Sequence, residues 1–353
     1  MVERKNGGIS SITAVRGSTI SGEILTRLDI LGIKPNEKLG QHFLIDSPSI
    51  DLLVESVGSG NTVLEIGAGL GQLTESLASK ATRVVAVEID RRFEPILSEL
   101  SKRFQNLQVV YGDAVSLRLE DYIVDKKGDK NAQIIASLPY HIIEPFMRKV
   151  TNLPIESATM VVGKRLADAI QARNEDSINF GRLSLLTQTF FDVQLLSNLS
   201  RDKFYPPPRT ESAIIKLVPK EEQEFRANRR DFLLRKLFNT SRKSPLVGNV
   251  LKEALEEFAF SHSNGTLSKR ESNQRDRRSL RVDLKQARQE YNIFGGLPIV
   301  PKHSTSMTDR DHLIRAGERA IIDSMGVPED ILGKPFDRLN NDELRILSKA
   351  LRN

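Results

Sequence analysis

The sequence predicts an α/β protein with a smaller, mostly helical C-terminal domain. Two patterns carry this prediction. Over the first 220 residues, short runs rich in β-branched residues alternate with segments of helical periodicity, which is typical of a parallel sheet with crossover helices. From residue 221 onward the sequence is charged and has helical periodicity. The length of 353 residues suits one large domain and one smaller domain.

The elements follow in order along the chain. The first expected strands are 62–66 (TVLEI), 83–89 (RVVAVEI), 107–111 (LQVVY) and 133–136 (QIIA). Beyond them we expect two helices at 164–173 and 182–189, then a strand at 212–218 after the triple proline at 206–208. The second domain is expected to contain helices at 229–238 and 250–258, and no strand before the apolar patch at 297–300.

These elements divide the chain into three segments. Residues 1–18 are small, polar and basic without periodicity, and we expect a flexible leader there. The α/β domain is expected at 19–220. The helical domain, expected at 221–353, carries a basic insertion around 262–308.

The composition excludes several classes of function. The chain has no cysteine, which removes disulfides and thiolate nucleophiles, and its five histidines indicate no metal site. The sequence has neither a signal peptide nor an uninterrupted apolar run of about 18 residues, so we expect a cytoplasmic protein without a membrane partner. Lys and Arg outnumber Asp and Glu by 52 to 46, and the net charge of +6 suits a polyanionic partner.

Part of the positive charge is concentrated at 269–288. This segment contains eight basic residues and three acidic ones. It fits an RNA-binding arm, but it fits a solvated linker equally well, because charged runs are frequent in both. The sequence leaves both alternatives open.

A glycine-rich turn follows the first predicted strand. TVLEI runs directly into Gly67-Ala68-Gly69-Leu70-Gly71, after which a helix pattern starts. Glycine is favoured here because a Cβ atom would block the approach of a nucleotide to the backbone, although a tight turn without a ligand has the same pattern. The spacing is G-x-G-x-G and not the G-x-G-x-x-G of dinucleotide-binding turns. It therefore favours a ligand without a pyrophosphate, such as S-adenosylmethionine.

Acidic residues end the next two predicted strands. Glu88 follows the glycine turn by about 20 residues, where a carboxylate can accept hydrogen bonds from ribose hydroxyls. Asp113, at the end of the third strand, suits either an adenine amine or an ordinary helix cap. Because the carboxyl ends of parallel strands lie at one edge of a sheet, the turn and the two acids indicate a nucleotide-cofactor site at that edge.

The segment Ser137-Leu138-Pro139-Tyr140 follows the fourth predicted strand at the same edge. It suits methyl transfer to an adenine amine, whose lone pair is delocalised into the ring. Acceptors at Ser137 and on the adjacent backbone would bond the amine hydrogens and direct the lone pair toward a methyl sulfonium. Pro139 would fix the turn, and Tyr140 would offer a face for a flipped-out base. Taken alone, these four residues also fit a simple turn.

Four segments in order carry a family resemblance: 38–46 (KLGQHFLID), 65–69 (EIGAG), 204–213 (FYPPPRTESA) and 237–242 (LFNTSR). Together they resemble the ribosomal RNA adenine N6,N6-dimethyltransferases of the KsgA type, which are related to the Erm methyltransferases. The resemblance covers residues 38–242. It implies a Rossmann-like methyltransferase sheet, S-adenosylmethionine as cofactor and ribosomal RNA as partner of a monomeric enzyme.

The resemblance also implies which positions bind the cofactor. These are His42 and Leu44 for the methionine part, Gly67 and Gly69 for the backbone turn, Glu88 for the ribose and Asp113 for the adenine, with Ser137 at the border of the cofactor site.

The target base is implied to lie at Ser137, Pro139 and Tyr140. Phe204 is either a second stacking face for the base or a core residue. The sequence departs from the family at Ser137, where the family usually has Asn. A Ser hydroxyl is shorter than the Asn amide and offers one donor, so the number of methyl groups transferred, one or two, stays open.

The expected function is methyl transfer from S-adenosylmethionine to the N6 amine of adenine in ribosomal RNA, with the small subunit as substrate during ribosome assembly. Two alternatives remain open. One is an Erm-like methyltransferase of large-subunit RNA. The other is a non-catalytic RNA-binding assembly factor of the same fold, which the serine at position 137 suggests.

Overall fold

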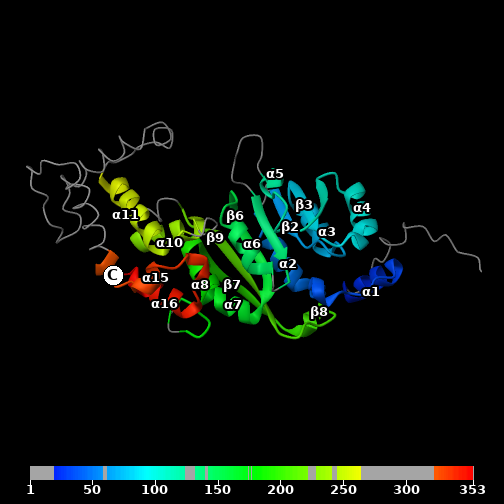
Figure 1. The fold of residues 1–353 in the computed structure, drawn as a ribbon. Helices are drawn as coiled ribbons and strands as arrows, with labels where there is room; N and C mark the ends of the chain where they lie inside the picture. Colours follow the sequence, from blue (N-terminus) through cyan, green and yellow to red (C-terminus); the bar gives the residue numbers. More distant parts are fainter. Residues whose placement is uncertain are drawn as a thin grey trace, which may run out of the picture. The chain divides into compact units, whose positions relative to one another are not determined.

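The computed structural model describes residues 20–58, 62–123, 132–139, 142–173, 175, 177–221, 228–240, 245–263 and 322–352 (Figure 1). The chain divides into two compact units. The first comprises Met1–Gln171 and Phe191–Pro219, and the second comprises Ala172–Phe190 and Lys220–Asn353. The expected leader at 1–18, the basic segment at 269–288, the apolar patch at 297–300 and residues 264–308 of the expected insertion lie outside the described residues.

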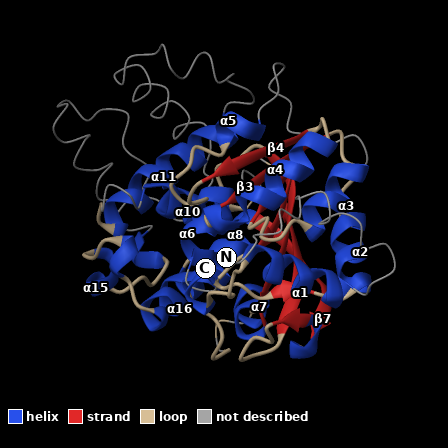
Figure 2. Cartoon of the chain, turned by 90° about the vertical axis from the view of Figure 1, so that its right-hand side faces the viewer, coloured by secondary structure: helices blue, strands red, loops and turns tan. Residues whose placement is uncertain are grey.

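The first unit is built on a seven-stranded sheet with the order β4-β3-β2-β5-β6-β9-β7. Neighbouring strands from β4 to β6 are parallel, and β9 is antiparallel to both β6 and β7. In Figure 2 the strands extend from β4 near the top to β7 near the bottom. The bounds are β2 (Thr62–Ile66), β3 (Arg83–Glu88), β4 (Leu107–Tyr111), β5 (Ala132–Ser137), β6 (Ile155–Gly163), β7 (Phe191–Leu199) and β9 (Ser212–Pro219).

Five of these strands are confirmed to within one residue of the ranges that the sequence predicts, namely β2, β3, β4, β5 and β9. The sequence pattern does not single out the other two. Strand β6 is buried at all but one position, so it lacks the alternation that marks a half-buried strand. The sheet also differs from the expected parallel one, because the connection from β7 to β9 contains no crossover helix and β9 therefore returns antiparallel.

Helices of the first unit cover the sheet. Helices α3 and α4 contact β3 and β4, and α7 contacts β6, β7 and β9. Helix α2 begins where a sequence signal places it, because the Asp46 side chain accepts from the Ser49 N–H and a proline lies in the first turn. The bounds are α1 (Ile20–Leu31), α2 (Ser47–Glu55), α3 (Gln72–Lys80), α4 (Glu94–Arg103), α5 (Glu120–Ile123), α6 (Ile143–Val150) and α7 (Lys164–Gln171).

The described part of the first unit also contains a two-stranded sheet and the short 3-10 helices η2, η3 and η5. Strand β1 (Phe43–Leu44) pairs antiparallel with β8 (Phe204–Tyr205). The 3-10 helices are η2 (Glu37–Leu39), η3 (Arg91–Phe93) and η5 (Arg201–Lys203). The small sheet brings the N-terminal loop beside the proline-rich segment, although more than 150 residues separate them in the sequence.

The second unit is helical in its described part. The helices predicted at 182–189, 229–238 and 250–258 are confirmed as α8 (Arg182–Phe190), α10 (Arg229–Thr240) and α11 (Val247–Ser263), followed by α15 (Glu329–Leu332), η7 (Phe336–Arg338) and α16 (Asn341–Ala350). An aromatic cluster joins them: the ring of Phe238 lies 5.8 Å from Phe190 and 4.8 Å from Phe336 between centroids. Residues 172–190 cluster with this unit, whereas a single division at 220 assigns them to the first. None of the described helices is long and apolar enough to cross a membrane.

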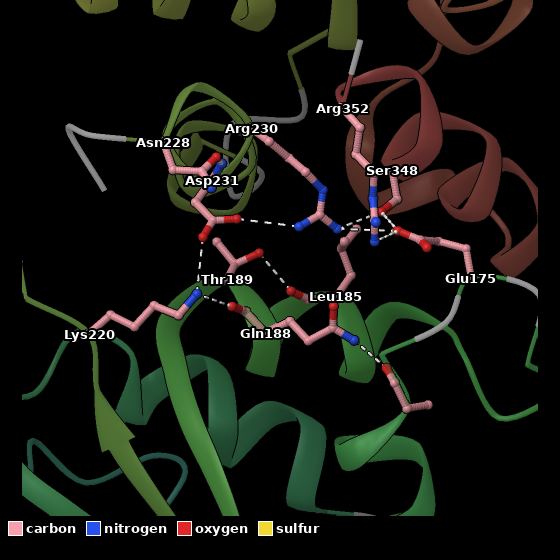
Figure 3. A network of polar contacts seen from close by, with 11 residues as sticks. Glu175, Leu185, Gln188, Thr189, Lys220, Asn228, Arg230, Asp231, Ser348 and Arg352 are labelled. Carbon is pink, nitrogen blue, oxygen red and sulfur yellow. Dashed lines mark hydrogen bonds and ion pairs between the residues drawn. The ribbon is translucent and has the colours of Figure 1, made fainter. Parts of the chain in front are cut away.

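A buried polar network ties the end of the chain to α10 within the second unit (Figure 3). Glu175 accepts from Ser348 Oγ at 2.8 Å and from the guanidinium of Arg352 at 2.6 Å, and Arg230 lies 3.4 Å away. Asp231 pairs with Arg230 at 3.4 Å on the other side. Burial opposes ionisation of Glu175, but hydrogen bonds led by that of Ser348 outweigh it and lower the pKa of the carboxyl.

Glu175→Gln is expected to lower the free energy of unfolding by about 2 kcal/mol, because Asp231 would be the one counter-charge left to Arg230 among the described residues, in a buried setting. Urea denaturation measures this change. Arg352→Gln is the matched control, since the side chain of Arg352 is 51% exposed and its loss should change the stability by less than about 1 kcal/mol. An equal or smaller loss for Glu175→Gln would contradict this account of the network.

Candidate active site

One pocket of the first unit lies at the carboxyl ends of β2, β3, β4 and β5. The ends of parallel strands meet there, which is where open α/β sheets bind ligands. The loop that leads into β1 forms another wall. Eight of the predicted site residues line this pocket: His42, Leu44, Gly67, Gly69, Glu88, Asp113, Ser137 and Pro139.

The glycine turn lies close against the end of β5. Gly67 has φ +87°, and a Cβ built there would lie 2.8 Å from the backbone oxygen of Ser137. Any side chain would therefore push the cofactor turn away from the Ser137 segment. The Gly67 N–H donates to the Val87 carbonyl at 2.9 Å, which fixes the turn between the two neighbouring strands.

Glu88 is 5% exposed and holds the surrounding backbone. Oε1 accepts from the N–H groups of Ile89 and Asp90, each at 2.8 Å, and Oε2 accepts from Gly69 N–H at 2.7 Å. Burial raises the pKa of Glu88, and these backbone donors oppose the shift. A carboxylate has about four acceptor positions, so the three bonds leave one on Oε2 for a ligand hydroxyl.

Asp113 caps the turn after β4. Its Oδ1 accepts from the Val115 N–H at 2.9 Å, and its Oδ2 accepts from Ser116 Oγ at 2.7 Å. The capping role that the sequence left open is therefore present in the structure. Because Asp113 also lines the pocket, its contact with an adenine remains a prediction.

The loop before β1 places His42 and Leu44 at the pocket. His42 Nδ1 lies 2.8 Å from the Pro206 carbonyl oxygen, and a carbonyl only accepts, so Nδ1 carries a proton in this contact. In a neutral ring Nε2 is then left as an acceptor. Leu44 is held by its pairing with Phe204 in the small sheet.

The predicted target-base residues are only partly brought together. Ser137 is exposed at the end of β5, and Pro139 lies two residues on at the pocket wall. Tyr140 lies outside the described residues. Phe204 is 3% exposed, belongs to the hydrophobic core with Phe43 and does not line the pocket. The structure thus favours the core alternative for Phe204 over the stacking face.

Sequence reasoning missed several residues of the pocket. Glu65 is 1% exposed, and neither of its carboxyl oxygens has a hydrogen-bond partner among the described residues. Ile89 is 54% exposed beside Glu88 and offers an apolar face to the pocket. An acid inside the otherwise apolar run TVLEI was a usable signal for Glu65, because buried acids are rare. No local pattern marked Ile89.

A sheet of this order, with a glycine turn lacking a phosphate cradle and acids at successive strand ends around one pocket, defines an S-adenosylmethionine-dependent methyltransferase. Residues 32–274 match the family model described as ribosomal RNA adenine dimethylase. The chain belongs to that family.

Two curated relatives agree with the family match. A probable ribosomal RNA small subunit methyltransferase A from Pyrococcus abyssi is 34% identical over 226 residues, which are 63% of this chain and 78% of the relative. A ribosomal RNA small subunit methyltransferase A from Listeria welshimeri is 35% identical over 216 residues, 60% of this chain and 72% of the relative. The crystal structure of a dimethyladenosine transferase from Plasmodium falciparum is 26% identical, with a TM-score of 0.48 and coverage of 86% of this chain and 96% of that one.

The enzymes of this family use S-adenosylmethionine, and the residues of the pocket fit that cofactor. The cofactor carries positive charge at its sulfonium and ammonium groups, and Glu65 presents two buried oxygens at the pocket that have no hydrogen-bond partner within the described part of the chain. Gly67 lines the pocket without a side chain, and Glu88 keeps one acceptor position. No group of three or more metal-ligating side chains occurs among the described residues.

Cofactor affinity is expected to rise with pH up to about pH 7. Burial raises the pKa of Glu65 from 4.5 to about 7. The nearby Thr74 hydroxyl opposes this shift, although it is outside hydrogen-bond geometry, and the negative charge of Glu88 adds to the shift. Between these two values the folded protein keeps a proton that the unfolded chain has lost, so stability falls as pH rises through this window. A bound cation favours the ionised carboxyl, so binding releases this proton.

Isothermal titration calorimetry at several pH values measures this linkage. The affinity should rise by at most about tenfold per pH unit below pH 7 and level off above it. Glu65→Gln should give a flatter profile, since the variant has no proton to release at that position. Identical slopes for the two proteins would exclude Glu65 as the titrating group.

Proposed function

We propose that this protein methylates the N6 amine of adenine in small-subunit ribosomal RNA during ribosome assembly. The observation that carries the proposal is the close approach of the cofactor turn to the Ser137 segment, where a Cβ at Gly67 would lie 2.8 Å from the Ser137 oxygen. A methyl donor held at the turn and an amine held at Ser137 would be immediate neighbours. The choice of the small subunit is supported by the names of the curated relatives, which are small subunit methyltransferases.

The proposed mechanism depends on holding the amine. S-adenosylmethionine supplies an electrophilic methyl group when it is bound. The Ser137 hydroxyl and the adjacent backbone carbonyls accept hydrogen bonds from the amine N–H groups. These bonds turn the lone pair out of conjugation with the ring and toward the methyl group. Pro139 fixes the turn that presents these acceptors. Tyr140 supplies the stacking face for the base.

The cofactor residues divide the remaining work. His42, through Nε2, and Leu44 contact the methionine part. Glu88 binds a ribose hydroxyl through its remaining acceptor position, and Asp113 accepts from the adenine amine while it caps its own turn. Ile89 covers one face of the adenine. Its apolar side chain is exposed at the pocket and can make this contact by packing, without a hydrogen bond.

A second candidate function is a non-catalytic assembly factor that binds cofactor and RNA. The short hydroxyl of Ser137 favours it, because the amide that the family usually carries reaches farther and offers an additional donor. A large-subunit substrate, as for the Erm methyltransferases, has less support, since the curated relatives described above are named for the small subunit.

The remaining parts of the proposal concern partners and location. The helical domain at 221–353, with the basic insertion around 262–308, holds the folded RNA. The protein works as a monomer, since the cofactor and Ser137 segments of one chain line the same pocket. Because it acts on assembling ribosomal subunits, a cytoplasmic location belongs to the same proposal.

Incubation with labelled S-adenosylmethionine and unmodified ribosomal subunits tests the proposal, with nucleoside analysis by mass spectrometry. Dimethyladenosine in small-subunit RNA is the expected product. Monomethyladenosine alone would limit the reaction to one transfer, and label in large-subunit RNA would favour the Erm-like alternative. Cofactor binding without any methylated adenine would favour the assembly factor.

The basic segment at 269–288 is expected to govern RNA affinity but not cofactor affinity. Replacing its arginines by glutamine should weaken RNA binding and reduce the salt dependence of the binding constant. The reason is that RNA binding releases fewer counterions when the protein makes fewer phosphate contacts. Filter binding between low and moderate salt measures both effects. Unchanged RNA affinity and an unchanged slope would identify the segment as a solvated linker.

A further inference from the structure

The side chain of Gln41 joins the loop at 36–42 to the turn that follows β3. Gln41 is 8% exposed, and both of its polar groups are used. Oε1 accepts from the Asn36 N–H at 2.8 Å, and Nε2 donates to Asp90 Oδ2 at 2.7 Å. A backbone N–H needs an acceptor and a carboxylate needs a donor, so only one orientation of the amide fits. Sequence reasoning assigned no role to either Gln41 or Asp90.

Asp90 connects this contact to Glu88. Its N–H donates to Glu88 Oε1 at 2.8 Å, while its buried carboxylate accepts from Gln41 and from Arg92 Nε at 2.9 Å. The Arg92 guanidinium is the main reason that the pKa of Asp90 is lowered, so the carboxylate stays ionised and remains an acceptor. The bonds therefore lead from the Glu88 side chain at the pocket, through the backbone N–H and the carboxylate of Asp90, to the Gln41 amide in the loop.

The two residues that flank Gln41 contact the Ser137 segment and the proline-rich segment at 204–213. A Cβ at Gly40 would lie 2.6 Å from Pro139 Cγ, so the backbone of the loop packs directly on the proline of the Ser137 segment. The next residue but one, His42, bonds the Pro206 carbonyl in the proline-rich segment. Movement of the loop would therefore displace Pro139 and Pro206 together.

We propose that Gln41 and Asp90 are positioning residues, which hold the loop at 36–42 against the cofactor pocket and thereby set the place of Pro139. The inference rests on the proposed function, in which the pocket binds S-adenosylmethionine and Pro139 lies at the target base. Loss of the Gln41 to Asp90 bond releases the loop from the turn that follows β3. The pocket wall formed by His42 then loses its fixed position, and cofactor affinity falls.

An exchange of the two side-chain polarities tests this proposal. Gln41→Glu places a carboxylate against the Asp90 carboxylate and should weaken S-adenosylmethionine binding by at least tenfold. Asp90→Asn alone should weaken it less, since an amide oxygen can still accept from Gln41. In the double variant, the introduced Asn amide can donate to the introduced carboxylate. That carboxylate can also accept from the Asn36 N–H and pair with Arg92, whose guanidinium lies 3.5 Å from Gln41 Oε1 in the wild-type protein. The double variant should recover to within about threefold of the wild-type affinity.

Gln108→Glu is the matched control. Gln108 is exposed on β4 and accepts from Arg83, so the same chemical change should leave cofactor affinity as it is. Isothermal titration calorimetry on the full-length protein, at a temperature where every variant is folded, provides the comparison. Wild-type affinity in Gln41→Glu, or a double variant that binds no better than Gln41→Glu, would overturn the proposal.

Two further measurements keep the outcome clear. If Gln41→Glu does not fold, Gln41→Met removes both hydrogen bonds without adding a charge, and it should bind the cofactor at least fivefold more weakly; wild-type affinity in that variant would overturn the proposal. Methyl transfer is assayed separately with unmodified subunits. A wild-type protein that transfers no methyl group would overturn the proposed function, while the affinity comparison would still decide the role of Gln41.

Discussion

Ser137→Ala is expected to lower kcat for methyl transfer by about 10²-fold, with a much smaller effect on the affinity for S-adenosylmethionine. The hydroxyl is the side-chain acceptor proposed to hold the amine, and removal of one such group costs about this much in comparable sites. Single-turnover assays on unmodified small subunits measure the rate, and calorimetry measures the affinity. An unchanged rate would leave the backbone carbonyls as the only acceptors that matter.

Ser137→Asn is the informative companion variant. It restores the family residue, whose longer amide reaches the amine with less backbone adjustment, and it should raise the rate or the proportion of dimethyladenosine. Tyr140→Ala should lower transfer through lost base stacking, worth about 1 to 3 kcal/mol, while cofactor affinity stays nearly intact. If the wild-type protein binds cofactor but methylates nothing, and Ser137→Asn does methylate, then the assembly-factor function is correct.

Glu88→Ala is expected to weaken S-adenosylmethionine binding by about 1 to 3 kcal/mol, toward the upper end of that range. The ribose acceptor is lost, and the N–H groups of Gly69, Ile89 and Asp90 lose their shared carboxylate as well. The glycine turn then loses one of the bonds that shape it. Calorimetry with Asp192→Ala as a control tests this, since Asp192 is an exposed acid on β7 of the same unit. Unchanged affinity would remove Glu88 from the site.

Glu88→Gln separates the two contributions. One amide oxygen can still accept from Ile89 and Asp90, but the amide NH2 would face the Gly69 N–H, donor against donor. The variant should therefore bind the cofactor nearly as weakly as Glu88→Ala, although its ribose-facing group is still polar. Affinity close to the wild-type value would show that the bond to Gly69 is dispensable.

Local patterns in the sequence were sufficient for five of the seven strands of the main sheet and for the edge of the sheet that carries the site. The β-branched runs predicted β2, β3, β4, β5 and β9 to within one residue. Strand ends in a parallel sheet are adjacent by construction, so Gly67, Glu88, Asp113 and Ser137 could be grouped from their positions after successive strands. Periodicity reports which face of an element is buried, and that was the information needed here.

Partners that lie far apart in the sequence needed the tertiary structure. Which surfaces meet decides the direction of β9 and the core position of Phe204. It also decides that residues 172–190 belong to the second unit. Nothing near Gln41 in the sequence indicates that its amide bonds Asp90, 49 residues away. Likewise Glu88 was predicted as a ribose acceptor, but the structure shows that three backbone N–H groups use it first.

The sequence by itself thus determined the fold class, the family and the edge of the sheet that carries the pocket. Only the tertiary structure decided how the residues at that edge are held: Glu65 has no hydrogen-bond partner among the described residues, Glu88 is shared by the glycine turn, and the loop at 36–42 is bonded to the turn after β3. The physical reason is that hydrogen bonding and burial are satisfied among groups that meet in space, whereas a sequence pattern records only the periodicity of each element.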